Sequence, residues 1–159
     1  MRILMAISAN GYTAQGPDDR MAWTGRHDKQ LFRALTMVDG GFMLAGTSTY
    51  TMMLQNKKAF GGRSLFQVST KHPGITLEDY HNRERRFQYW LIGGQTVALA
   101  ALRKGFVTEV HLSRVHHEVT IRNPDYEDAI RDWLIKNWGN KCLEAVTVHG
   151  PDLLETWHL

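Results

Sequence analysis

Short apolar runs alternate with helical segments and glycine-rich turns along most of this 159-residue chain, and this alternation restricts the folds it can adopt. Runs of strand length are Arg2–Ala9, Gly41–Ala45, Ser64–Val68, Phe87–Ile92 and Thr108–Val115. Alternating strands and helices are typical of a mostly parallel sheet with helices on both faces. Near the C-terminus, Leu143–Val148 and Leu153–Leu159 flank a turn and predict an antiparallel hairpin. We therefore predict a single α/β domain over residues 1–159 with a mostly parallel central sheet.

The composition of the chain excludes several functional classes. Cys142 is the single cysteine, so no disulfide can form within the chain, which suits a reducing, cytoplasmic environment. No segment has the length of a signal-peptide core or of a membrane span. The histidines His111, His116 and His117 lack the spacing of a metal site, so we expect no metal. The net charge of +3 and the pI near 9.1 fit either nucleic acid or a pocket for phosphates and carboxylates.

The stretch Met21–Val38 contains the first candidate for chemistry. Read as a helix from about Gly25, it should bury a face made of Leu31, Ala34, Leu35 and Val38. Asp28 falls on or beside this face, where a low dielectric would raise its pKa toward neutrality and suit it to proton transfer. Alternatively, Asp28 is a first-turn acid favoured by the helix dipole, with Thr24 or Gly25 as the N-cap.

Two junctions place glycine between a strand and a helix. Gly46–Thr49 follows one apolar run and opens a short helix, and Gly93–Thr96 leads into the amphipathic helix Val97–Lys104. Backbone N–H groups and hydroxyls at a helix N-terminus can bind phosphate. Helix capping alone also favours serine and threonine at such positions, and any tight turn favours glycine.

The other segments are assigned more coarsely. Ser69–Lys71 follows the third strand, and a long polar loop runs from Asn10 toward Met21. Because these segments and both glycine junctions lie at carboxyl ends of predicted strands, we expect them to converge on one cleft. The polar region up to Arg86 should hold a short strand and a short helix. Asp125–Trp138 is expected as a loop or short helix on the outside, and Cys142 as a small hydrophobe in a strand.

The order and spacing of these pieces resemble dihydrofolate reductase and its superfamily, which includes the reductase domain of riboflavin biosynthesis. The resemblance covers nearly the whole chain and is carried by MAISANG, MAWTGRHDKQLFRALT, AGTSTY, GGRSLFQVS, LIGGQTV, VHLSRVHHEV and PDYED. Each motif is weak alone, but in this order they are fairly specific. The resemblance implies an NADPH-dependent oxidoreductase with one small-molecule substrate.

The resemblance also implies roles for individual residues. Asp28 matches the pterin-binding acid, Trp23 the tryptophan that holds a water beside it, and Ser113 the hydroxyl residue that supports it. Arg63 matches the arginine that grips the α-carboxylate of the folate tail. The implied substrate-binding residues are Ala6, Ile7, Asp28, Phe32, Arg63, Ile92 and Ser113. The implied cofactor-binding residues are Ile7, Gly46, Thr47, Ser48, Thr49, Ser69, Thr70, Lys71, Ile92, Gly93, Gly94, Gln95, Thr96 and Val97. The loop Asn10–Ala22 would close over the nicotinamide.

Several positions depart from the pattern of the superfamily. Thr47 and Ser48 stand where an arginine would grip the 2′-phosphate of NADPH, although Lys71 with Ser69 and Thr70 could compensate. Ala98 replaces an aromatic residue that meets the nicotinamide, and Ala22 replaces a proline. The opening SANGYTAQGPDD is closer to the riboflavin-type reductases.

Three functions follow from these observations. The first is NADPH-dependent reduction of dihydrofolate to tetrahydrofolate, by a cytoplasmic monomer or weak dimer without membrane contact. The second is a reductase of the same superfamily that acts on a ribosylaminopyrimidine or another pterin. The third is a non-catalytic module that binds nucleotide or nucleic acid, although a nucleic-acid partner is not favoured.

Overall fold

The computed structural model of the chain describes residues 1–16, 18–55, 60–122, 130–141 and 143–159. Its strands are β1 (Arg2–Ile7), β2 (Phe42–Gly46), β3 (Ser64–Val68), β4 (Tyr89–Leu91), β5 (Glu109–Arg114), β6 (Leu143–His149) and β7 (Asp152–His158). Its α-helices are α1 (Gly25–Thr36), α2 (Thr47–Leu54), α3 (Leu77–Arg83), α4 (Gln95–Arg103) and α5 (Ile130–Trp138). Two short 3₁₀ helices, η1 (Ala22–Thr24) and η2 (Val38–Gly40), flank α1.

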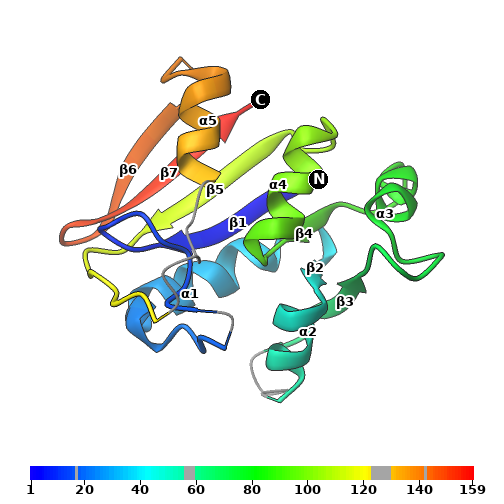
Figure 1. The fold of residues 1–159 in the computed structure, drawn as a ribbon, viewed down its shortest axis with the longest axis horizontal. Coiled ribbons are helices and arrows are strands. Elements are labelled where there is room, and N and C mark those ends of the chain that lie inside the picture. Colours follow the sequence, from blue (N-terminus) through cyan, green and yellow to red (C-terminus); the bar gives the residue numbers. More distant parts are fainter. Residues whose placement is uncertain (17, 56–59, 123–129, 142) are drawn as a thin grey trace.

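The strands form one sheet in the order β3-β2-β4-β1-β5-β7-β6 (Figure 1). Strand β1 pairs in parallel with β4 and β5, and β2 pairs in parallel with β3 and β4. Strand β7 is antiparallel to both β5 and β6. The predicted α/β architecture, with a mostly parallel sheet and a C-terminal antiparallel hairpin, is therefore confirmed.

One face of the sheet carries the larger hydrophobic core. Helices α3, α4 and α5 contribute buried side chains to it, together with strand residues such as Ile7, Leu112 and Trp157. Ile130 and Leu134 of α5 are completely buried. The predicted short helix is therefore confirmed over residues 130–138, although it buries one apolar side against the sheet and does not lie wholly outside.

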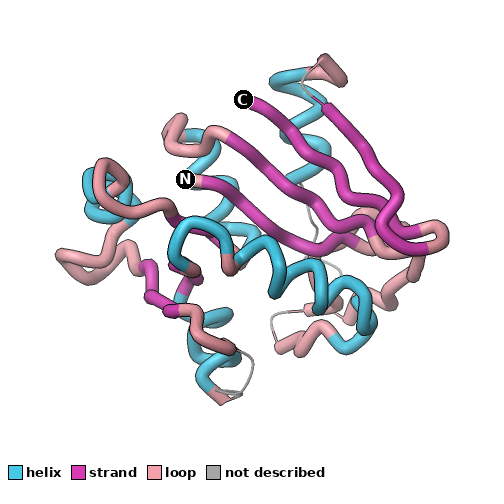
Figure 2. Tube along the Cα trace, turned by 180° about the vertical axis from the view of Figure 1, so that it is seen from behind, coloured by secondary structure: helices cyan, strands magenta, loops and turns pink. Residues whose placement is uncertain are grey.

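The opposite face is covered by α1 and α2, and its core is smaller. Figure 2 shows α1 as the long helix that crosses in front of the strands. Leu4, Met43, Ala45, Trp90 and Ile92 form the buried cluster. Phe32 and Leu35 of α1 and Tyr50 and Met53 of α2 are only partly buried against it.

The predicted buried face of α1 is partly wrong. Ala34 and Val38 are exposed, the latter to 45%, whereas Thr36 is fully buried. The helix turns Asp28, Phe32, Leu35 and Thr36 toward the sheet, a stripe with spacings of four, three and one residues. The helix also ends at Thr36, and η2 continues the chain where the sequence predicts helix.

Several predicted boundaries differ from the structure. Strand β1 ends at Ile7 because Ser8 turns the chain, its backbone N–H donating to the carbonyl of Tyr12 at 2.8 Å. Strand β4 is confined to Tyr89–Leu91, and α4 begins two residues earlier than predicted. The described segment 69–86 contains α3 but not the predicted short strand.

Residues 125–129 and Cys142 lie outside the described residues. Within the described part, no helix is long and apolar enough to cross a membrane.

Candidate functional site

Asp28 lies in the first turn of α1, half-buried on the side that faces the sheet. Burial raises the pKa of its carboxyl group, because removal from water disfavours the charged form. Hydrogen bonding from the side chains of Ser113 and Thr24 and the charge of Lys29 oppose this rise, and the charge of Asp152 adds to it. Asp28 therefore meets the physical requirement for a proton-handling acid, and its position in the first turn does not exclude this role.

Ser113 reaches Asp28 because of the register of the sheet. In the pairing of β1 with β5, Ser113 lies opposite Ala6. Ser113 is buried, and its side chain is on the α1 face, since Asp28 of α1 is hydrogen-bonded to it. Ile7, by contrast, packs its side chain into the larger core on the other face. Alternation along one strand thus directs Ala6 and Ile7 to opposite sides of the sheet.

Arg63, just before β3, is 7% exposed and rigidly held. Its Nε donates to the carbonyl of Phe60 at 2.7 Å, and its Nη1 donates to Oγ1 of Thr36 at 2.7 Å. The guanidinium carbon lies 5.6 Å from the ring centroid of Phe32. Burial and the nearby charge of Arg33 lower the pKa of Arg63, yet an arginine remains protonated in proteins.

Thr36 is a functional candidate that sequence reasoning missed. Its hydroxyl accepts from Arg63 and donates to the carbonyl of Phe32 at 2.7 Å, so it orients the guanidinium from the helix. A signal was present in the sequence. A threonine lies at i+4 from Phe32 and i+8 from Asp28, which places all three on one side of the helix.

The two glycine junctions lie side by side at the carboxyl ends of β2 and β4. The backbone N–H of Gly46 donates to the carbonyl of Gly93 at 2.8 Å, and the Gly93–Gly94 peptide is cis. A Cβ placed on Gly46 would lie 2.7 Å from Cγ2 of Val97, so only glycine permits this approach without movement of Val97. Neither α2 nor α4 has a side-chain N-cap hydrogen bond. Both helices thus point first-turn N–H groups at one region, a favourable arrangement for phosphate.

Hydroxyl groups surround these junctions. Oγ1 of Thr49 would lie 3.5 Å from a Cβ placed on Gly93 and 3.6 Å from one placed on Gly94, so this hydroxyl is close to both glycines. Oγ1 of Thr47 accepts from Nε2 of Gln67 at 3.0 Å, and Oγ of Ser69 accepts from the backbone N–H of Lys71 at 3.2 Å. The predicted convergence of Gly46–Thr49, Ser69–Lys71 and Gly93–Thr96 follows from the adjacency of β3, β2 and β4.

Trp23 is fixed by an acid that sequence reasoning did not single out. Its indole Nε1 donates to Oδ2 of Asp19 at 2.8 Å. Its ring is nearly parallel to that of His117, with centroids 6.4 Å apart. Whether Trp23 also holds a water near Asp28 stays a prediction.

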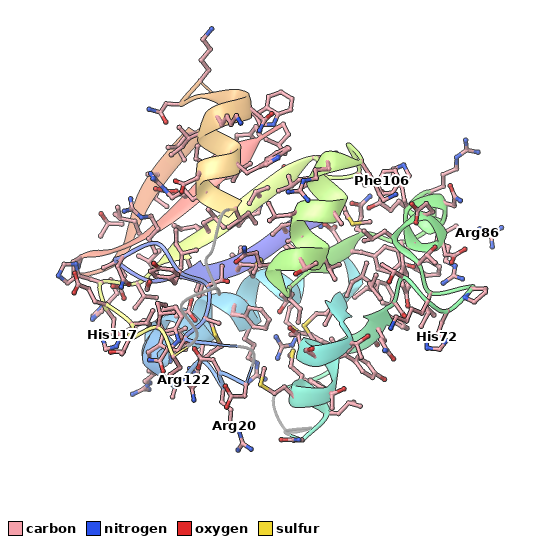
Figure 3. The ribbon with its side chains drawn as sticks, viewed as in Figure 1. Arg20, His72, Arg86, Phe106, His117 and Arg122 are labelled. Carbon is pink, nitrogen blue, oxygen red and sulfur yellow. The ribbon has the colours of Figure 1, made fainter. Side chains whose placement is uncertain are left out.

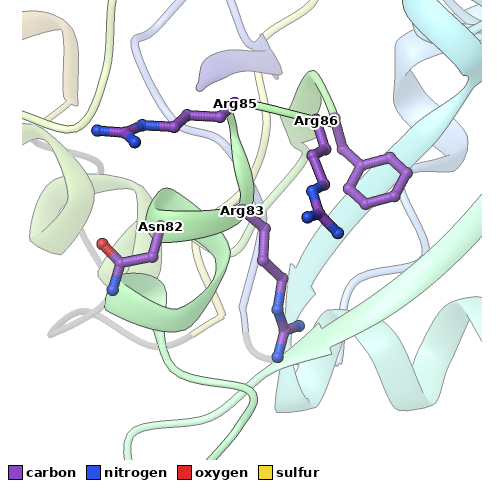
Figure 4. Close-up of a pocket in the computed structure, with 5 residues that line it drawn as sticks. Asn82, Arg83, Arg85 and Arg86 are labelled. Carbon is purple, nitrogen blue, oxygen red and sulfur yellow. The ribbon is translucent and has the colours of Figure 1, made fainter.

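Two surface hollows lie apart from the Asp28 face. One, of about 520 Å³, is lined by Asn82, Arg83, Arg85, Arg86 and Phe87 (Figure 4). These residues precede β4, whereas the glycine junction follows it, so this hollow lies at the other end of that strand. The second, of about 410 Å³, is lined by residues 7–12 with Arg114, Arg131 and Asp132. Among the described residues, no group of three or more His, Cys, Asp or Glu side chains could hold a metal ion.

Two solved structures resemble this chain over nearly its whole length. One is the dihydrofolate reductase from Enterococcus faecalis complexed with NADP(H) and RAB-propyl, with a TM-score of 0.69 and 15% identity over 99% of this chain and 94% of that chain. The other is Schistosoma mansoni dihydrofolate reductase, with a TM-score of 0.65 and 14% identity over 99% of this chain and 96% of that chain. This chain has a dihydrofolate reductase-like fold. No protein-family model and no curated protein sequence matches it.

At these identities the similarity to dihydrofolate reductase concerns the fold alone. Substrate and reaction therefore depend on the residues that this fold brings together. Asp28, Phe32 and Thr36 come from α1, Ser113 from β5 and Arg63 from the start of β3.

Proposed function

We propose that the chain is an NADPH-dependent reductase that converts 7,8-dihydrofolate to tetrahydrofolate. The observation that carries this proposal is the half-buried carboxylate of Asp28, whose pKa is raised and which is hydrogen-bonded by Ser113. A neutral carboxyl group at this position can donate a proton, and an ionised one can accept hydrogen bonds. The dihydrofolate reductase-like fold supports the proposal by supplying a precedent for this architecture.

The residues beside Asp28 suit a flat heterocycle. Asp28 would accept two hydrogen bonds from the amino group and a ring N–H of the pterin and promote protonation of the ring. Phe32 would pack against the aromatic rings, and the carbonyl of Ile92 would face the pterin. Ala6 and Ser113 would complete the wall on the sheet side, since both lie at the same level of β1 and β5.

Arg63 is the reason to prefer a folate over a ribosylaminopyrimidine. A buried guanidinium that is oriented by Thr36 and Phe60 presents a fixed cation, which suits a carboxylate better than a mobile surface arginine would. Its position next to the ring of Phe32 fits a substrate whose aromatic part ends in a carboxylated tail. A phosphorylated sugar substrate would need several donors at this place.

The glycine junctions fit a dinucleotide, because they combine close backbone approach with N–H groups and hydroxyls. Gly46–Thr49, Ser69–Lys71 and Gly93–Val97 would hold the phosphates, and Ile92 would line the nicotinamide. Ile7 could contribute only its backbone there, because its side chain lies in the larger core on the other face. When bound, NADPH supplies the hydride, and the chain orients the two reactants and excludes water. Lys71 is the cation we assign to the 2′-phosphate, since Thr47 and Ser48 carry no charge.

The decisive experiment follows the absorbance of NADPH at 340 nm with dihydrofolate as substrate. We expect oxidation of NADPH that depends on dihydrofolate and is lost in Asp28→Asn. Parallel assays with NADH and with a ribosylaminopyrimidine test the cofactor and the second candidate substrate. Turnover of the pyrimidine without turnover of dihydrofolate would refute the folate assignment, and no turnover of either would refute the proposed reductase activity.

We further propose that the enzyme works in the cytoplasm as a monomer or weak dimer.

A further inference from the structure

Asp19 is a buried acid in the segment between β1 and η1, and only 6% of it is exposed. Its carboxylate accepts three hydrogen bonds, all from groups of the same segment or of η1. Oδ2 accepts from the backbone N–H of Gln15 at 2.7 Å and from the indole N–H of Trp23 at 2.8 Å, and Oδ1 accepts from the backbone N–H of Met21 at 2.8 Å. A carboxylate withdrawn from water needs such donors, so the four groups stabilise one another.

The segment held by Asp19 is also connected to elements on two sides. Toward the region after β5, Asn10 and Val119 exchange two hydrogen bonds of 3.0 and 3.1 Å, and the N–H of Arg122 donates to the carbonyl of Gln15 at 3.0 Å. Toward α2, the guanidinium of Arg20 donates to Oε1 of Gln55 at 3.5 Å. Arg20, His117 and Arg122 lie on the same side of the molecule (Figure 3). The segment therefore runs from the β5 side of the sheet to the helix that follows β2.

Met21 connects Asp19 to the acid of the site. It has a φ of 61°, an uncommon left-handed conformation for a residue other than glycine. Its N–H is held by Asp19, and its carbonyl accepts from the N–H of Thr24 at 3.3 Å and from Nζ of Lys29 at 3.0 Å. Thr24 and Lys29 both act on the ionisation of Asp28. A short chain of polar contacts thus runs from Asp19 through Met21 to Asp28.

We propose that Asp19 is a positioning residue, whose buried carboxylate holds the segment between β1 and η1 against the start of α1, where Asp28 lies, and fixes the indole of Trp23. The structural part of this proposal depends only on the hydrogen bonds of Asp19. Its catalytic consequence rests on the proposed reductase function. Loss of the carboxylate should release Gln15, Met21 and Trp23 together, because one group holds all three.

The adjacent acid Asp18 provides a matched control. Its side chain is 80% exposed and forms an ion pair with Arg122 at 3.4 Å, so its charge is next to that of Asp19 but in water. Asp19→Asn keeps the shape and removes the charge, and Asp18→Asn makes the same change one residue away. Trp23→Phe removes the indole N–H and keeps an aromatic ring.

Two measurements on the whole protein test the structural part. The first is the ¹H–¹⁵N spectrum of the indole groups, in which Trp23→Phe identifies the signal of Trp23 among five tryptophans. We expect Asp19→Asn to shift this signal and Asp18→Asn to leave it in place. The second is amide hydrogen exchange. Exchange at Gln15 and Met21 should rise about tenfold or more in Asp19→Asn, as expected for loss of hydrogen bonds to a charged acceptor. An unmoved indole signal together with unchanged exchange would overturn the proposal.

The catalytic consequence is tested by steady-state kinetics of the same variants. We expect kcat/KM of Asp19→Asn to fall by about tenfold, because the site would be less ordered and more accessible to water. Asp18→Asn should match the unmodified enzyme, and Asp19→Asn combined with Trp23→Phe should be little worse than Asp19→Asn alone. Wild-type turnover in Asp19→Asn, despite faster exchange, would refute the positioning role. If the unmodified protein reduces no substrate, the proposed function fails, while the spectra and the exchange rates still decide whether Asp19 holds the segment.

Discussion

The face of the sheet under α3, α4 and α5 carries the larger core, with many completely buried side chains, whereas under α1 and α2 a small buried cluster is bordered by helix side chains that are only partly covered. Leu112 and Trp157 on the first face have no exposed surface. On the second face, Phe32 and Leu35 lie beside the half-buried Asp28. The same sheet thus has one side with an extensive closed core and another on which apolar side chains stay partly accessible, as the proposed site requires.

The proposed site therefore lies on the face where the hydrophobic packing is incomplete. A helix that packed fully against the sheet would remove the carboxylate of Asp28 from water, and the free-energy cost of burying an ionised carboxylate is high. Because α1 is only partly packed, its acid is desolvated enough for its pKa to rise and is still reachable. Substitutions on the two faces should therefore separate stability from activity.

The largest effect should come from the closed face. Leu112→Ala should lower the free energy of unfolding by about 2–5 kcal/mol, because a completely buried leucine leaves a cavity. Leu35→Ala, the same change on the α1 face, should cost about 1 kcal/mol or less, since its side chain is already partly in water. Urea denaturation measures both values. Equal losses would mean that the two faces are packed alike.

The next largest effect concerns catalysis. Asp28→Asn should lower the rate of hydride transfer by at least about 10²-fold near neutral pH, the usual scale for loss of a general acid. In the unmodified enzyme the rate should fall as the pH rises through the pKa of Asp28, which lies above the ordinary value of an aspartate. Single-turnover kinetics across pH measure both. A near-normal rate in Asp28→Asn would remove the acid from the mechanism.

Arg63 tests the substrate end of the open face. Arg63→Leu should raise KM for dihydrofolate by about 10- to 100-fold, the range expected for loss of a hydrogen-bonded ion pair with the carboxylate. A pterin without the glutamate tail should show little change. Arg33→Leu is the control, because Arg33 is an exposed neighbour on α1. A similar rise in KM for both substrates would indicate damage to the fold around Phe60 and Thr36 instead.

A helix end on the closed side should show a smaller effect, confined to stability. Thr76 and Asp79 form a capping box at the start of α3, in contrast to the uncapped starts of α2 and α4. Thr76→Ala should cost about 1 kcal/mol and lower Tm by about 2–4 °C. Turnover should be unchanged. Calorimetry and the NADPH assay together check this, and a loss of turnover would link α3 to the site.

The smallest effect is a gain of stability in Asp28→Asn. Because the folded-state pKa is raised, the native protein binds more protons than the unfolded chain between the two pKa values, and stability falls as pH rises through that interval. Asparagine removes this loss. Tm of Asp28→Asn should therefore exceed that of the unmodified protein at pH 7 by less than the change in Thr76→Ala, and the gain should disappear at low pH. An Asp28→Asn variant less stable at pH 7 would show that the charge is not disfavoured.

The closed face was more predictable from the sequence than the open one. Largely buried strands such as β1 and β2 are continuous apolar runs or nearly so, and their predicted bounds agree with the structure within two residues. The sequence predicts Ala34 and Val38 on the buried face of α1, but the helix turns Asp28, Phe32 and Thr36 toward the sheet and ends before Val38. Periodicity reports hydrophobicity and cannot distinguish burial against protein from burial against a ligand.

Residues whose own side chains would carry the chemistry could be predicted from the sequence. Residues that orient them through tertiary contacts could not. Asp28 could be proposed from its place on the helix and Gly46 from its place after a strand. Thr36 supports Arg63 across a gap of 27 residues, and Asp19 supports Trp23 from within a loop. Contacts of this kind depend on tertiary packing, and no local pattern in the chain specifies them.

The pairing of β1 with β5 determines when, during synthesis of the chain, the candidate site can first form. Asp28 leaves the ribosome long before Ser113, which reaches it only when β5 pairs beside β1. A growing chain that has not yet released β5 would carry the acid without the hydroxyl that accompanies it. The contact between Asp28 and Ser113 thus forms late in biosynthesis, and a folate analogue that binds the proposed site should stabilise only chains that have progressed past β5.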